Sequence, residues 1–198
     1  MNTTFNSLVN NMQNCCICES HLDHKPRPVF QISHKATILL AGQAPGKIVH
    51  NTGVPFNDLS GKRLRSWMNV SEETFYDTSK IAILPIGLCY PGKGCSGDLP
   101  PRRECAPLWR QQAIDAMPDI QLVLLIGGYA LDWHLGTLKK SNLTRTVAAW
   151  HEYAPNIFPL PHPSPRNNIW IKKNPWFETE VLPALRQQVR KVLKYQNQ

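Results

Sequence analysis

Two short loops carry the side chains best suited to chemistry. The segment GQAPG at 42–46 has two glycines and a proline, which allow a tight turn whose backbone can approach a ligand closely. The segment PHPSPRN at 161–167 has three prolines. They stiffen a loop that offers an imidazole, a hydroxyl, a guanidinium and an amide. We expect the two loops to meet over a single cavity that is formed before the substrate arrives.

The cysteines form a second candidate site. Cys15 and Cys18 are separated by two residues, and Cys89 and Cys105 by fifteen. The N-terminal residues are polar and uncharged, unlike a signal peptide, so we expect a cytoplasmic protein with reduced thiols. Four thiolates can hold a tetrahedral zinc ion or an iron–sulfur cluster, and the spacing alone favours zinc. We expect the two remaining cysteines to be simple thiols.

Short apolar runs alternate with helical patterns along the chain. The runs are continuous, as in parallel strands that are covered on both faces. They span residues 36–42, 81–87, 122–127 and 157–160, and the expected helices span 61–69, 102–117, 128–135, 142–150 and 177–195. This order predicts an α/β fold, a three-layer α/β/α sandwich with a central, mainly parallel four-stranded sheet. Ligands bind at the carboxyl ends of such strands, where both loops begin.

Length and charge limit the classes of protein. With 198 residues, 42% of them hydrophobic, the chain fits one globular domain over residues 1–198. No apolar run reaches the roughly 18 residues that a membrane span needs, so we expect no membrane partner. A net charge of +8 is compatible with a nucleic-acid partner. We take a monomer as the default.

The order GQAPG, GVPFNDLSG, HPSPRN resembles the motif set of the uracil-DNA glycosylase superfamily. The resemblance implies an enzyme that flips uracil or another deaminated base out of DNA and hydrolyses its N-glycosidic bond, in base excision repair. No lysine stands clearly at an expected nucleophile position, so we expect a monofunctional enzyme. It assigns water and base contacts to Gln43, Ala44 and Gly46, base stacking to Phe56, and stabilisation of the departing base to His162. It assigns DNA contacts to the last loop, at Ser164, Arg166 and Asn167.

The cysteine pattern resembles the iron–sulfur branch of this superfamily. This resemblance implies a [4Fe–4S] cluster held by Cys15, Cys18, Cys89 and Cys105, with structural zinc as the alternative. Such a cluster would tie residues 1–30, which otherwise look disordered, to the rest of the domain.

The chain departs from the family pattern at two positions. Gln43 stands where the iron–sulfur branch typically has a glutamate, and glutamine cannot accept a proton as a base. A carboxylate could instead come from Asp58, which we take as a catalytic candidate, or from Asp98. The alternative for both is a capping or turn-forming role.

Pro85 is the second departure, because it stands where relatives carry an asparagine that reads uracil. Tyr90 or Asn57 could compensate for the lost amide. The departures leave two alternatives open. One is a catalytically weak or inactive protein that binds DNA lesions, and the other is an enzyme that acts on free nucleosides or nucleotides.

Overall fold

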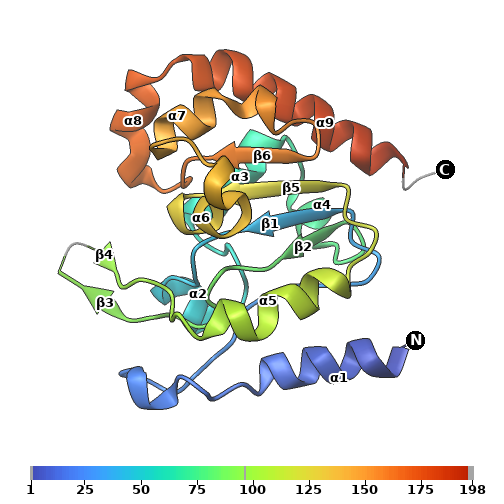
Figure 1. The fold of residues 1–198 in the computed structure, drawn as a ribbon, viewed down its shortest axis with the longest axis vertical. Helices are drawn as coiled ribbons and strands as arrows, with labels where there is room; N and C mark the ends of the chain where they lie inside the picture. The colour runs from blue at the N-terminus through green and yellow to red at the C-terminus, as the bar shows by residue number, and fades with distance from the viewer. Residues whose placement is uncertain (1, 96, 196–198) are drawn as a thin grey trace.

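A parallel sheet forms the centre of the molecule (Figure 1). The computed structural model describes residues 2–95 and 97–195. The strand order is β2-β1-β5-β6, with neighbours paired in parallel. The strands are β1 (Ile38–Ala41), β2 (Ile81–Ile83), β5 (Leu122–Ile126) and β6 (Ile157–Leu160). A small antiparallel hairpin, β3 (Lys93–Gly94) and β4 (Gly97–Asp98), stands apart from this sheet.

Helices connect the strands. The α-helices are α1 (Asn2–Gln13), α2 (Lys47–Thr52), α3 (Leu59–Met68), α4 (Glu72–Tyr76), α5 (Cys105–Asp115), α6 (Gly128–Leu135), α7 (Leu143–Ala148), α8 (Asn168–Lys173) and α9 (Leu182–Tyr195). Short 3₁₀ turns occur at Glu19–His21, Gly136–Leu138, Trp150–Glu152 and Pro165–Asn167, and a π-helical turn at Phe177–Val181. None of the described helices is both long and apolar enough to cross a membrane.

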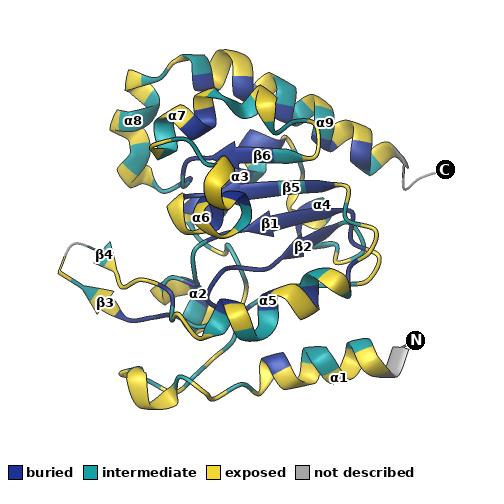
Figure 2. Ribbon diagram, in the orientation of Figure 1, coloured by how far each residue is buried: buried dark blue, intermediate teal, exposed yellow. Residues whose placement is uncertain are grey.

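Successive side chains of β1 pack on opposite faces of the sheet, which gives the three layers. Ile38 and Leu40 join a cluster with side chains of α3 and α9. Leu39 packs on the other face, with side chains of α1 and α5. The strands are therefore almost fully buried (Figure 2), as continuous apolar runs require. The expected three-layer α/β/α fold is confirmed.

Differences from the expected elements are local. The first two strands are shorter than the apolar runs, and Pro85 lies beyond the end of β2. The long segments 46–60 and 89–101 contain α2 and the β3–β4 hairpin. The polar N-terminus forms the helix α1, which packs on α5. Near the C-terminus, a π-helical turn precedes Pro183, because proline cannot donate a helical hydrogen bond.

Candidate active site

The two loops lie at the carboxyl ends of β1 and β6 and meet over one cavity of about 580 Å³. Gln43, Phe56 and His162 all line it. Of the other expected site residues, the structure brings the following to the same cavity: Ala44, Gly46, Asp58, Ser164, Arg166 and Asn167.

The first loop is held by backbone hydrogen bonds that continue the sheet. The N–H of Ile86 donates to Gly42 O (2.9 Å), and that of Gly87 donates to Gln43 O (2.9 Å). The side-chain amide of Gln43 donates to Leu99 O (3.4 Å), just after β4. The Gln43 side chain therefore bridges the first loop and the segment that follows the hairpin.

Phe56 is presented to the cavity by a tight turn. Its backbone has φ 54°, and its ring makes an edge contact with Phe75, with centroids 6.2 Å apart. Asp58 is the N-cap of α3, and its side chain accepts a hydrogen bond from Gly61 N–H (2.9 Å). A Cβ added at Gly61 would lie 1.7 Å from Phe56 O, so this position requires glycine. The GVPFNDLSG motif thus fixes the position of the Phe56 ring.

His162 is held as a neutral donor. Its Nδ1 accepts a hydrogen bond from Ser164 N–H (3.2 Å), which assigns the ring proton to Nε2. Burial lowers the pKa of His162 below its usual 6.5, partly offset by the charges of Asp58 and Asp98. The imidazole is therefore neutral at pH 7 and can still donate a hydrogen bond.

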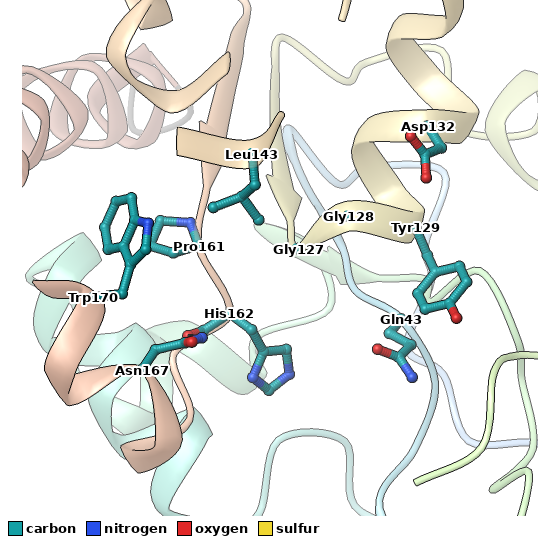
Figure 3. Close-up of a pocket in the computed structure, with 10 residues that line it drawn as sticks. All are labelled: Gln43, Gly127, Gly128, Tyr129, Asp132, Leu143, Pro161, His162, Asn167 and Trp170. Atoms are coloured by element: carbon teal, nitrogen blue, oxygen red, sulfur yellow. Dashed lines mark hydrogen bonds between the residues drawn. The ribbon is translucent and has the colours of Figure 1, made fainter. Parts of the chain in front are cut away.

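A second cavity of about 230 Å³ lies beside the first (Figure 3). The two share three residues, Gln43, His162 and Asn167. Tyr129 lines the second cavity from the start of α6, and Trp170 lines it from α8. These shared residues can contact groups in both cavities.

The last loop is anchored from α3 by Arg63, a residue to which the sequence assigned no role. Arg63 donates to Ser164 O (3.1 Å) and to Asn168 Oδ1 (2.8 Å). Asn167 donates to His162 O (2.6 Å). The only signal for Arg63 was its place just after the GVPFNDLSG motif, which says nothing of a contact 101 residues away.

The two candidate carboxylates both line the cavity, and so does Pro85. The capping role considered for Asp58 is present, since its side chain binds the Gly61 N–H. Asp98 projects from β4. Asn57 and Tyr90, expected as substitutes for the missing asparagine, are not among the described residues that line this cavity.

A small pocket on another part of the molecule is lined by four free cysteines: Cys15, Cys18, Cys89 and Cys105. The N–H of Leu88 donates to Cys105 Sγ and the indole N–H of Trp109 to Cys15 Sγ, both at 3.3 Å. Burial raises the pKa of Cys89 to about 12 and that of Cys105 to about 11. Within the described residues, no three side chains of His, Cys, Asp or Glu are placed to hold a single metal ion.

The chain matches a known family model over most of its length. The family model of the Uracil DNA glycosylase superfamily matches residues 29–186. The matched segment contains both loops of the cavity, as well as Cys89 and Cys105.

Proposed function

The chain belongs to the uracil DNA glycosylase superfamily, and from this premise we propose that it hydrolyses the N-glycosidic bond of uracil or another deaminated base in DNA. The proposed process is base excision repair. One observation carries the proposal: an aromatic ring and a rigid glycine–proline loop line one cavity together with a neutral histidine that is far from both in sequence.

Base flipping would bring the substrate to this cavity. A base inside a duplex is out of reach, and its extrusion costs a few kcal/mol. Stacking on the ring of Phe56 would return about 1–3 kcal/mol. Ser164, Arg166 and Asn167, which line the cavity with His162, would contact the DNA backbone, which positions the duplex without reading its sequence.

His162 would stabilise the departing base. Cleavage leaves an oxocarbenium-like sugar and an anionic base, and the Nε2–H of His162 can donate to an oxygen of that anion. A donor fixed in advance is the principle of an oxyanion hole. No lysine occurs among the described residues that line the cavity, which supports attack by water and a monofunctional enzyme that leaves an abasic site.

We propose in addition that Cys15, Cys18, Cys89 and Cys105 hold a [4Fe–4S] cluster. The four thiols line one pocket, and two N–H groups donate to their sulfurs. Such donors tune cluster sulfurs. A bound cluster would act structurally, joining residues 15–18 to the segment that leads into α5.

The cluster proposal can be tested on protein purified without oxygen. We expect four irons and four sulfides per chain and a broad visible absorption, both lost in the double variant Cys89→Ala, Cys105→Ala. The variant Cys16→Ala is the matched control and should retain the iron. One zinc per chain, or no bound metal, would contradict the proposal.

The activity can be tested with oligonucleotides that contain uracil, hypoxanthine or xanthine, followed by alkali. We expect strand scission at one or more of these bases, and none with the undamaged oligonucleotide. Intact DNA with every substrate would refute the proposed function.

A DNA-lesion binding protein is the second candidate. Gln43 in place of a carboxylate and Pro85 in place of an amide both favour it, since both residues line the cavity and neither can perform the replaced function. Specific retardation of damaged DNA in gels, without scission after alkali, would select this alternative.

A further inference from the structure

The cavity contains two carboxylates in different situations. Asp58 accepts the Gly61 N–H at the start of α3, so one of its oxygens has a structural role. Asp98 caps none of the described helices. It lies on the β3–β4 hairpin, far from Asp58 in sequence, and lines the same cavity.

Asp98 faces the loop that would handle water and base. Its Oδ2 lies 3.6 Å from the position that a Cβ on Gly46 would occupy. Tyr90 is only 6% exposed, and burial together with the nearby charge of Asp98 raises the pKa of its hydroxyl. A buried hydroxyl therefore lies near this carboxylate, and one carboxylate oxygen faces the first loop.

The residues on either side of Asp98 contact the active-site loops. The carbonyl of Leu99 accepts the amide hydrogen of Gln43. A Cβ on Gly97 would lie 2.8 Å from Nη1 of Arg166, so the Arg166 side chain reaches across to the hairpin. The hairpin segment is thus in contact with both the first loop and the last loop of the site. In the sequence, Asp98 stands between the two residues that make these contacts.

We propose that Asp98 is the catalytic base that the first loop lacks. This inference rests on the proposed glycosylase function. The bond from C1′ to the base nitrogen breaks, and its electron pair leaves with the base, which His162 stabilises as an anion. The oxygen of water bonds to C1′ and its proton passes to the carboxylate of Asp98, which later releases it to solvent. Gln43, through its amide, orients the water without accepting the proton.

The experiment compares Asp98→Asn with Asp58→Asn in single-turnover cleavage, at several pH values and with DNA binding measured separately. Loss of a general base costs about 10²–10⁴-fold in rate. We therefore expect Asp98→Asn to lose at least about 100-fold in the cleavage rate, to bind DNA as the wild type does, and to lose the acidic limb of the pH–rate profile. Asp119→Asn, at an exposed aspartate that lines neither cavity, is the control and should stay within about threefold of wild type.

The possible outcomes are distinguishable. If the wild type cleaves and Asp98→Asn keeps its rate and pH profile, the role of Asp98 is refuted while the proposed function stands. If Asp58→Asn alone loses the acidic limb, the base is Asp58. If the wild type cleaves no deaminated base, the proposed function fails and the role of Asp98 fails with it. Equal thermal unfolding midpoints will show that the variants are folded.

Discussion

Phe56 and Gly61 illustrate how one residue fixes another at short range. The positive φ of Phe56 places its carbonyl where any side chain at Gly61 would collide with it. Positive φ is costly for a residue with a side chain, and such strain is typically found at functional sites. The turn and the aromatic ring of the cavity are therefore one structural unit.

Replacing Gly61 by alanine should destabilise the fold and displace Phe56. The added Cβ would lie 1.7 Å from Phe56 O, and overpacking of this kind costs about 1–3 kcal/mol or more. Urea unfolding measures the loss. Gly128→Ala is the matched control, since nothing lies within 4 Å of its added Cβ, and it should leave stability within about 0.5 kcal/mol.

Replacing His162 by alanine should slow cleavage with little effect on DNA binding. Removing one donor of an oxyanion hole costs about 10²–10³-fold in rate. The lowered pKa of His162 also means that the neutral ring acts, so the wild-type rate should not fall as pH rises from 7 to 8. A fall over that interval would indicate a protonated His162 instead.

The residue types in the sequence motifs were enough to predict part of the site. Gln43, Phe56 and His162 could be chosen because their chemistry and their motifs are visible in the sequence, and they share a cavity. The contacts of Arg63 could not be predicted, because its partners lie about 100 residues away in the sequence. The relation of Asp98 to Gly46 depends likewise on how the hairpin folds back.

At the scale of elements, Arg110 joins two helices to the end of a strand. This arginine of α5 is 1% exposed. It donates to Leu84 O (2.8 Å) and Pro85 O (3.2 Å), just beyond β2, and to Nε2 of His134 on α6 (3.0 Å). Burial, together with the charge of Arg110, lowers the pKa of His134 to about 3. This junction therefore requires a neutral histidine.

Acid should weaken this junction at a pH set by His134. Below pH 6.5 the unfolded chain binds a proton that the folded chain does not bind until about pH 3. The free energy of unfolding should therefore fall by up to about 1.4 kcal/mol per pH unit in this interval. His134→Gln keeps an acceptor but does not titrate, so its unfolding free energy should fall less steeply. Parallel pH curves for the two proteins would contradict this prediction.

Arg63 connects α3 to the last loop, and its loss should affect that loop alone. With Ser164 O and Asn168 released, the loop should exchange its amide hydrogens faster, and we expect cleavage to fall by about tenfold, the effect of losing about 1.4 kcal/mol of transition-state binding. Global stability should change by less than about 1 kcal/mol. Arg186→Ala is the control, because Arg186 binds the other end of α3, at Ser66 O and Trp67 O.

Elements were predictable where their own pattern determines them. The four strands are continuous apolar runs, and α6 begins and ends where expected. Helix α1 was missed because its sequence is mostly polar and its burial depends on contact with α5. Helix α2 and the β3–β4 hairpin are short, and such segments are stabilised by tertiary packing rather than by propensity.

At the scale of the whole molecule, the charge of +8 should make DNA binding dependent on salt. Each phosphate neutralised contributes about −0.9 to the slope of log K against log salt. We expect a slope of several units for the His162→Ala variant, which cleaves the substrate slowly, and a slope smaller by about one when Arg166→Ala is added. A flat dependence, measured by fluorescence anisotropy, would argue against DNA as the partner.

Both outer strands of the sheet are poor templates for self-association. Beside β2, Gln31 exchanges backbone hydrogen bonds with Ile83 (2.8 and 2.6 Å), and its side-chain amide donates to Ile81 O (2.7 Å). At the opposite border, β6 carries Pro159, which has no N–H to offer. Unprotected borders recruit other chains and lead to aggregation. At high concentration the protein should therefore not aggregate through these strands, as long as its sheet stays folded.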